Sequence, residues 1–370
     1  MLTAWTCPGP AIKCSTTPFA VTDRGTDVLT LAPPQKSTQA SDWESYSSGE
    51  DARVLAPVRL AGPSQITCAR MQPRTRSFKH DGHRLVYDEY GTGERTVILM
   101  PGLLFSRKMH GPLASTLAQR GYRVLCLDLL GHGDSDRPPE MGNYSMAIFG
   151  AQAHGLMDHL GIGTAVLGGT SLGANTTLEA AAKDSSRVQG MLIEMPVLDN
   201  ALLACGIAFA PLMMALSFGA PVTRALSRAA RLVPRRGPLL ADLALDWISQ
   251  DPKPSASVLQ GLLFGRVAPP HEERITLEAP ALIIGHARDP IHPFSDSDML
   301  VQELPDARLV EASSILELRL SPERLTGEIV VFIDECWEGA GERPAARRRR
   351  GSRPNASGAA NTASRRRSAS

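Results

Sequence analysis

The chain has 370 residues, of which 43% are hydrophobic and 21% charged, with a formal net charge of +1. This composition is typical of a globular protein with one large core and excludes fibrous and disulfide-dense classes. The six cysteines form no C-x-x-C pair, which argues against a zinc site and a secreted disulfide framework, so we predict reduced thiols and a cytoplasmic location.

The first segment, residues 1–70, is rich in Ser, Thr, Pro and Ala and shows little hydrophobic periodicity. It lacks the basic start and long apolar core of a secretory signal. We therefore predict a disordered N-terminal extension over 1–70. Met71 stands directly before the first strand-like segment, so translation from Met71 is an alternative to translation from Met1.

The first ordered elements are expected to be strands. Residues 77–90 alternate around the pair Asp81-Gly82, which tolerates the positive φ angles of a two-residue hairpin turn. The apolar run 96–100 indicates a buried strand. The loop Pro101-Gly102-Leu103-Leu104 follows it and can direct a backbone N–H, that of Leu103, at a developing oxyanion.

Helices and strands then alternate. The pattern predicts a helix over 110–120, a strand over 122–127 and a second helix over 145–160 that begins at the N-cap Ser145. Between the last two lies the loop Asp128-Leu129-Leu130-Gly131-His132-Gly133-Asp134-Ser135. Strands alternating with helices at this spacing indicate a mainly parallel sheet covered on both faces.

The central motif lies in residues 164–175. A short apolar run ends in Gly169-Thr170-Ser171-Leu172-Gly173, and an alanine-rich helical segment follows. A serine on so tight a turn takes a strained backbone conformation, and glycines flank it because a Cβ there would collide with a neighbouring element. The Leu172 amide lies at a helix N-terminus, where it can stabilise an oxyanion. We therefore predict that Ser171 is a nucleophile.

These features resemble the α/β-hydrolase superfamily, both in the strand, G-x-S-x-G, helix order and in the D-x-x-G-x-G-x-S loop at 128–135. The resemblance covers about 76–200 and 279–337. It implies an α/β fold with a mainly parallel eight-stranded sheet flanked by helices, an inserted helical cap, and an active site at the carboxyl ends of the strands. Serine at the elbow argues against members that resemble dehalogenases or epoxide hydrolases, which carry aspartate there.

This resemblance divides the chain into parts. We assign the hydrolase core to 71–199 and 271–338, the helical cap to 200–270, and a disordered Arg-rich tail to 339–370. A strand over 190–195 completes the first part of the core.

The predicted cap begins with 201–222, which contains no charged residue and is long enough to be a transmembrane candidate. Pro211 and the glycines at 206 and 219 interrupt it, and a cap over a hydrolase site needs an apolar inner face. We therefore favour a cap over a membrane span.

An arginine stripe follows in 223–233. Arg224, Arg228 and Arg231 recur at helical spacing and face away from Leu226, Ala229 and Leu232. The stripe is either simply solvated or a contact for an anionic membrane surface or a phosphate-bearing substrate such as an acyl thioester.

The core is expected to resume with an apolar strand at 279–285. Asp289 follows this strand, where the resemblance places the acid of a catalytic triad. The alternative is a turn aspartate beside Pro290. A helix over 295–304 and a strand over 307–311 come next.

The triad histidine implied by the resemblance is missing from its usual place after the last strand. Residues 311–320 contain no histidine, and none follows His292. A serine without a base in reach stays weakly nucleophilic at pH 7. His286 and His132 are interpreted as structural, although both could line the mouth of the pocket.

Three explanations stay open. His292 could supply the base, with Asp289, Glu194 or Asp199 as the acid. The enzyme could instead work through its oxyanion hole and a poor base, which still leaves an acceleration of about 10³–10⁴ over water. Finally, the fold could have lost catalysis and kept its pocket.

The C-terminal part combines a helix with a basic tail. The helix is expected from the N-cap Ser321, with Pro322 at the first helical position, to Trp337. Beyond Glu342 the chain holds nine arginines and no acidic residue, which leaves a net charge of −8 on the first 342 residues. Such a tail is either a solvated extension or a nonspecific contact for polyanions.

Taken together, these patterns predict a serine hydrolase that cleaves a carboxylic ester or thioester with an apolar acyl group through an acyl-enzyme. The predicted catalytic residues are Ser171, Asp289 and His292, and Leu103 and Leu172 form the predicted oxyanion hole.

The expected partner is a small-molecule apolar acyl substrate, with no metal or organic cofactor, no specific nucleic acid, and at most weak polyanion or membrane-surface contact. Two alternatives are kept: a catalytically impaired hydrolase-fold protein that binds an apolar small molecule, and an acyltransferase.

Overall fold

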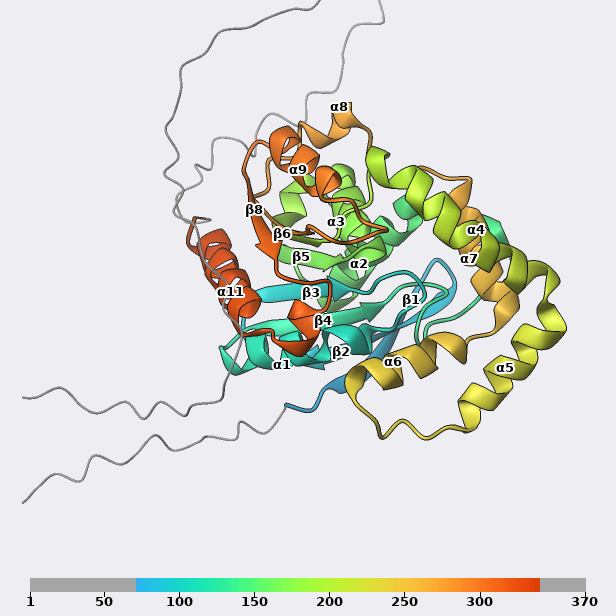
Figure 1. Ribbon diagram of the computed structural model, residues 1–370. Helices are drawn as coiled ribbons and strands as arrows, with labels where there is room; N and C mark the ends of the chain where they lie inside the picture. The colour runs from blue at the N-terminus through green and yellow to red at the C-terminus, as the bar shows by residue number, and fades with distance from the viewer. Residues whose placement is uncertain (1–70, 340–370) are drawn as a thin grey trace, which may run out of the picture. The chain divides into compact units, whose positions relative to one another are not determined.

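The structure is a computed structural model that describes residues 71–339 (Figure 1). The predicted N-terminal extension and the Arg-rich tail from residue 340 onward lie outside the described residues, so those predictions stay untested.

The described chain forms one eight-stranded sheet with the order β1-β2-β4-β3-β5-β6-β7-β8. β1 and β2 pair antiparallel, as do β2 and β4, and every later pair is parallel. The strands are β1 (Arg74–His80), β2 (His83–Tyr90), β3 (Thr96–Met100), β4 (Arg123–Asp128), β5 (Ala165–Thr170), β6 (Val188–Glu194), β7 (Ala281–His286) and β8 (Ala307–Ala312). The predicted α/β class with a mainly parallel eight-stranded sheet is confirmed.

Helices flank the sheet and form the long connection between β6 and β7. The α-helices are α1 (Gly111–Gln119), α2 (Met146–Leu160), α3 (Leu172–Lys183), α4 (Leu202–Phe218), α5 (Ala220–Leu232), α6 (Leu239–Ile248), α7 (Pro252–Leu263), α8 (His271–Arg274), α9 (Phe294–Glu303), α10 (Glu317–Leu320) and α11 (Glu323–Glu338). Short 3₁₀ turns are η1 (Arg107–His110), η2 (Met141–Asn143), η3 (Ser185–Arg187) and η4 (Asp199–Ala201).

Local sequence explains where the elements turn and end. Asp81 and Gly82 both take positive φ angles, 48° and 81°, as a tight hairpin turn requires. Ser145 caps α2 by accepting a hydrogen bond from the Ile148 amide, and Gly161 ends the helix in the left-handed conformation.

The core forms on both faces of the sheet because successive side chains of a buried strand point to opposite sides. Ile98 and Met100 pack with Leu178 of α3 on one face. Val97 and Leu99 pack with α1 and α11 on the other. The parallel strands are therefore apolar throughout, as a sheet covered on both faces demands.

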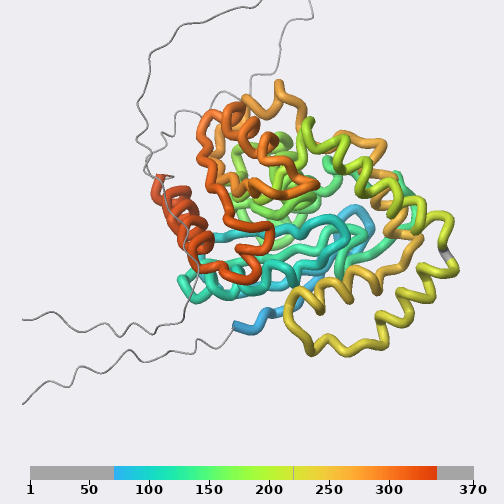
Figure 2. Tube along the Cα trace, in the orientation of Figure 1, coloured from blue at the N-terminus to red at the C-terminus, as the bar shows by residue number. Residues whose placement is uncertain are grey.

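Helices α4 to α7 occupy the range predicted as the cap, 200–270. Figure 2 shows this part of the chain leaving the core after β6 and returning to it before β7. Within α5, Ser227 and Ala230 form the buried side, whereas Leu226, Ala229 and Leu232 are exposed. The apolar stripe of α5 thus faces solvent instead of the interior.

The start of the last helix differs from the prediction by one residue. Ser321 ends α10, and Pro322 stands at the cap position of α11 with no side-chain hydrogen bond, so the first helical residue is Glu323. The short α10 uses the serine that the sequence pattern assigned to α11.

Two buried histidines make the fold sensitive to mild acid. Burial lowers the pKa of His110 and of His132 to about 4, against 6.5 in a solvated chain. His110 Nε2 lies 2.9 Å from the Met100 carbonyl and His132 Nδ1 lies 3.0 Å from the Leu130 carbonyl, so each neutral ring donates one N–H.

We expect the free energy of unfolding to fall as the pH drops from 6.5 towards 4. In this pH window the histidines bind protons in the unfolded chain but not in the folded chain. Acidification to pH 5 therefore lowers the free energy of unfolding by about 2 kcal/mol for each histidine. Urea unfolding at pH 7 and pH 5 measures this, and His132→Asn should lessen the fall. Equal stability at the two pH values would contradict the assignment.

Candidate active site

The tight turn between β5 and α3 positions Ser171. This residue has φ 54° and ψ −109°, a backbone conformation that L-residues rarely adopt. Its amide donates a 2.8 Å hydrogen bond to the Glu194 carbonyl at the end of β6, which holds the turn against the sheet. The hydroxyl therefore lies above the carboxyl ends of the central strands, where open α/β sheets bind their ligands.

The glycines on either side of this turn are required by close backbone packing. A Cβ on Gly173 would lie well inside contact distance of the Met100 carbonyl oxygen, and a Cβ on Gly169 would meet both Met100 and Gly173. The first turn of α3 can approach the end of β3 only because neither position carries a side chain.

Three predicted residues are in hydrogen-bond contact. His292 Nε2 lies 2.8 Å from Ser171 Oγ, and His292 Nδ1 lies 2.8 Å from Asp289 Oδ2. The acid and the histidine come from one loop after β7, three residues apart. This chain of contacts has the serine, histidine, carboxylate order of a catalytic triad.

Asp289 is also organised by its own loop. Its Oδ1 accepts hydrogen bonds from the Ile291 amide at 2.8 Å and the His292 amide at 3.0 Å. Burial acts to raise the pKa of this carboxyl, but the hydrogen bonds from the His292 ring and the two amides outweigh it and lower the pKa to about 2. Asp289 is therefore ionised at neutral pH.

The ionised carboxylate decides the tautomer of His292. A carboxylate can only accept, so the nitrogen facing it, Nδ1, must carry the proton. Nε2 is then left as the acceptor that faces the Ser171 hydroxyl, which is the arrangement a general base needs.

An ion pair involves the segment where the resemblance places the missing histidine. Arg319 of α10, after β8, donates 2.8 Å hydrogen bonds to both carboxylate oxygens of Glu194 and another to Thr170 Oγ1. Burial acts to raise the pKa of Glu194, and the charge and hydrogen bonds of Arg319 lower it. The Glu194 carboxylate, which lies beside the Ser171 turn, is thus paired with an arginine.

The other sequence candidates lie in different surroundings. Asp199 is exposed and pairs with Arg274 at 3.6 Å. His286 is buried at the end of β7, with Nδ1 3.0 Å from the Ser314 carbonyl, and burial lowers its pKa. His132 is fully buried in the loop after β4. None of the three is recorded in contact with Ser171 in the described part of the chain.

Ser171 opens onto an apolar cavity of about 320 Å³. On one side it is lined by Leu103, Leu172 and Met146, and on the other by residues of α4 and α7, which lie in the range predicted as the cap. Polar groups are few, and the Cys205 thiol among them is neutral because burial raises its pKa to about 11. This volume is at the lower end of the range for ligand pockets, about 300–1,000 Å³.

A comparison with protein families identifies the family of this chain. Residues 95–314, more than half of the chain, match the family model described as alpha/beta hydrolase fold. The chain belongs to the α/β hydrolase fold family.

Individual relatives are more distant. Mouse bifunctional epoxide hydrolase 2 is 38% identical over 87 residues, which are 23% of this chain and only 15% of that protein. The enol-lactonase from Burkholderia xenovorans LB400 superposes with a TM-score of 0.58 at 23% identity, covering 70% of this chain and 100% of its own. A thermophilic esterase from Thermogutta terrifontis gives a TM-score of 0.56 at 22% identity, covering 72% and 99%. These likenesses show the fold.

In this α/β hydrolase, the two residues predicted to form the oxyanion hole, Leu103 and Leu172, border the cavity with Ser171. Leu172 is the first residue of α3, where helical N–H groups have no intrahelical acceptor. Neither the Leu103 amide nor the Leu172 amide donates a hydrogen bond to another described residue. Both are therefore available to a ligand.

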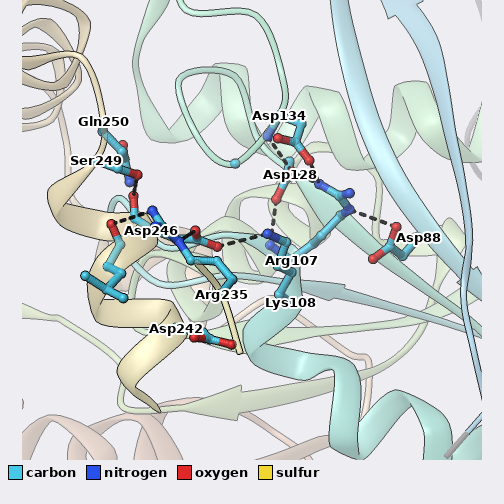
Figure 3. A network of polar contacts seen from close by, with 12 residues as sticks. Asp88, Arg107, Lys108, Asp128, Asp134, Arg235, Asp242, Asp246, Ser249 and Gln250 are labelled. Carbon is cyan, nitrogen blue, oxygen red and sulfur yellow. Dashed lines mark hydrogen bonds and ion pairs between the residues drawn. The ribbon is translucent and has the colours of Figure 1, made fainter. Parts of the chain in front are cut away.

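A buried arginine, which the sequence did not point to, anchors the loop after β3. Figure 3 shows Arg107 between three carboxylates, Asp88, Asp128 and Asp134. Arg107 and Asp128 are buried, and the charge of Asp128 helps to raise the pKa of the arginine despite the opposing effect of burial. The loop after β3 is thus tied to the end of β4.

The range predicted as the cap, 200–270, also contacts this loop. Gln250, between α6 and α7, donates to the Leu104 carbonyl, and Leu104 has a φ of 60°. Lys108 pairs with Asp246 of α6 at 2.9 Å, which Figure 3 shows beside the Arg107 cluster. The sequence gives little sign of these two contacts, because each joins residues more than a hundred positions apart. The presence of polar residues in these loops is the one signal that could have indicated them.

We expect Gly173→Ala to lower the free energy of unfolding by at least about 3 kcal/mol, because its methyl group would overlap the backbone of β3. Gly163→Ala is the matched control, since nothing lies within 4 Å of a Cβ at that position. Urea unfolding of both variants gives the comparison. Equal stabilities would show that the turn is not constrained as described.

Proposed function

We propose that this protein is a serine hydrolase that cleaves a carboxylic ester or thioester with an apolar acyl group. The observation that carries the proposal is the chain of contacts from Ser171 through His292 to Asp289, with Ser171 lining an apolar cavity. The esterase and the enol-lactonase among the similar solved structures support the same class of chemistry.

The first half-reaction forms an acyl-enzyme. Ser171 Oγ attacks the acyl carbon while its proton passes to His292 Nε2, and the Leu103 and Leu172 amides stabilise the oxyanion. The tetrahedral intermediate then collapses, and the leaving alcohol or thiol takes the proton from His292. Asp289 stabilises the imidazolium without taking its proton.

The second half-reaction releases the acid. Water attacks the acyl carbon and gives its proton to His292 Nε2, and Ser171 recovers this proton as the ester bond breaks. The products are the carboxylic acid and the free enzyme. An acyltransferase would use the same residues with an alcohol or amine in place of water.

The contact between Ser171 and His292 favours catalysis over the alternative of a fold that only binds an apolar molecule. A serine that only lines a binding pocket gains nothing from an oriented histidine and carboxylate, whereas a serine that attacks a substrate needs both. The aspartate-dependent chemistry of epoxide hydrolases is disfavoured because Ser171 stands at the elbow.

We expect kcat/KM for p-nitrophenyl esters to rise with acyl length up to a medium chain, because each buried methylene contributes about 0.8 kcal/mol until the cavity is full. Gly206→Leu should shift this preference to shorter chains. Gly206 lines the cavity, and nothing lies within 4 Å of a Cβ at this position, so the new side chain fills space that the substrate needs.

The matched control is Gly327→Leu in α11, where the surroundings of a Cβ are also open. It should leave the chain-length profile unchanged. Hydrolysis that persists in Ser171→Ala, or that shows no dependence on acyl length, would contradict the proposed function.

A further inference from the structure

Helix α4 is apolar on two opposite faces. One face lines the active-site cavity with Leu202, Phe209 and Met213. On the other face, Leu203 is 75% exposed and Phe218 is 78% exposed. The cavity accounts for the apolar side chains of the first face and not for those of the second. Large apolar side chains gathered on a surface mark an interaction site.

The length and hydropathy of this segment, Asp199–Phe218, would suffice to cross a membrane, and it has few buried residues. A crossing is incompatible with the fold, because α4 would carry the roof of the cavity away from Ser171. A helix with one face on the protein and an apolar face outside can instead lie in the plane of a membrane interface.

Helix α5 continues the exposed surface and adds charge. Its exposed apolar side chains are Val222, Leu226 and Leu232, while Ser227 and Ala230 pack inward. Arg224 and Arg228 lie between these two sides, on a third stripe that is also exposed. An apolar stripe beside an arginine stripe, both turned outward, is the pattern of an interfacial helix.

The charged side chains around α4 and α5 are all positive. Residues 201–241 contain five arginines and no acidic residue. Arg231 and Arg235 are used within the cap, on the Ser249 carbonyl and on Asp246. The side chains of Arg224 and Arg228 have no hydrogen-bond or ion-pair partner among the described residues, so they are available to an external anion.

We propose that the exposed side of α4 and α5 is a docking face for an anionic phospholipid bilayer. The docking face consists of Leu203, Ile207, Met214 and Phe218 on α4 and of Val222, Arg224, Leu226, Arg228 and Leu232 on α5. The apolar side chains enter the boundary between headgroups and acyl chains, and the arginines bind lipid phosphates.

A second copy of the chain fits this face less well. A symmetric dimer would place the same patch of each copy against the other and bring the unpaired arginines of both together. Like charges that meet in an interface oppose association, whereas an anionic bilayer neutralises them.

Docking has a consequence for substrate access. Because the inner face of α4 lines the cavity and the outer face would rest in the bilayer, one helix thickness would separate the Ser171 site from the lipid acyl chains. This consequence rests on the proposed function, whereas docking itself does not. Binding can therefore be measured in the full chain carrying Ser171→Ala.

The experiment places a tryptophan on the docking face. Phe218→Trp is compared with Val331→Trp on α11, a position that is 50% exposed. The vesicles contain phosphatidylglycerol with brominated phosphatidylcholine. We expect a blue shift and quenching for Phe218→Trp only, after subtraction of the native tryptophan signal.

The arginines are tested by vesicle sedimentation. Each arginine near an anionic surface contributes about fivefold in affinity, so Arg224→Gln with Arg228→Gln should weaken binding about 25-fold. Arg120→Gln, exposed on the core, is the control and should bind like the wild type. Added salt should weaken wild-type binding.

Two results would overturn the proposal. Sedimentation without quenching of Phe218→Trp would assign lipid binding to another part of the chain, such as the arginines beyond residue 341. Self-association that Phe218→Ser abolishes, seen by light scattering without lipid, would assign the face to a second copy. A failure of ester hydrolysis would leave the docking result unaffected.

Discussion

The approach of the first turn of α3 to the end of β3 is the constraint on which the site depends. It is possible because Gly169 and Gly173 present no Cβ to the Met100 carbonyl. This contact forces Ser171 into its positive φ and sets the Leu172 amide at the start of α3. The loop with Leu103 begins directly after Met100, so Ser171 and both predicted oxyanion donors are positioned by the same few backbone atoms. Strain of this kind persists only where surrounding structure holds it, here the end of β6, whose Glu194 carbonyl accepts a hydrogen bond from the Ser171 amide.

The site also depends on a four-residue stretch, Asp289 to His292. The Asp289 carboxylate accepts hydrogen bonds from two amides of its own loop and from the His292 ring, so it orients that ring without help from another strand. This local arrangement explains how the proposed base can come from the loop after β7 while Arg319, after β8, pairs with Glu194. The long-range ion pair joins α10 to the end of β6, and the short-range loop holds the proposed proton acceptor, His292. The two tasks are separated in the chain, although they meet beside Ser171.

Much of this arrangement could be predicted from the sequence because it is encoded locally. The period of apolar residues, the Asp81-Gly82 turn and the caps of α2 are short-range signals, and G-x-S-x-G fixes its own backbone. Asp289 and His292 could both be proposed from the sequence, because one follows an apolar strand and no histidine follows the other. The pairing of Glu194 with Arg319 could not be predicted, because the two residues lie 125 positions apart. The Arg107 cluster and the cap contact from Gln250 join residues far apart in the chain, which periodicity cannot reveal. The sequence also could not predict that the apolar stripe of α5 faces solvent. A helical pattern shows that a stripe exists but not which side of the helix the protein covers.

The central claim is that Ser171 is an activated nucleophile whose base is His292. It is tested most directly by treating the full chain with a fluorophosphonate and reading adducts by intact mass, beside Ser171→Ala and His292→Ala. The account predicts one adduct on the wild type, none on Ser171→Ala, and labelling of His292→Ala slower by about 10³-fold or more, because the serine loses its proton acceptor. Undiminished labelling of His292→Ala would contradict the role of that residue and direct attention to His286 or His132. A wild type that forms no adduct would contradict the claim as a whole and favour a hydrolase fold that binds its ligand without cleaving it.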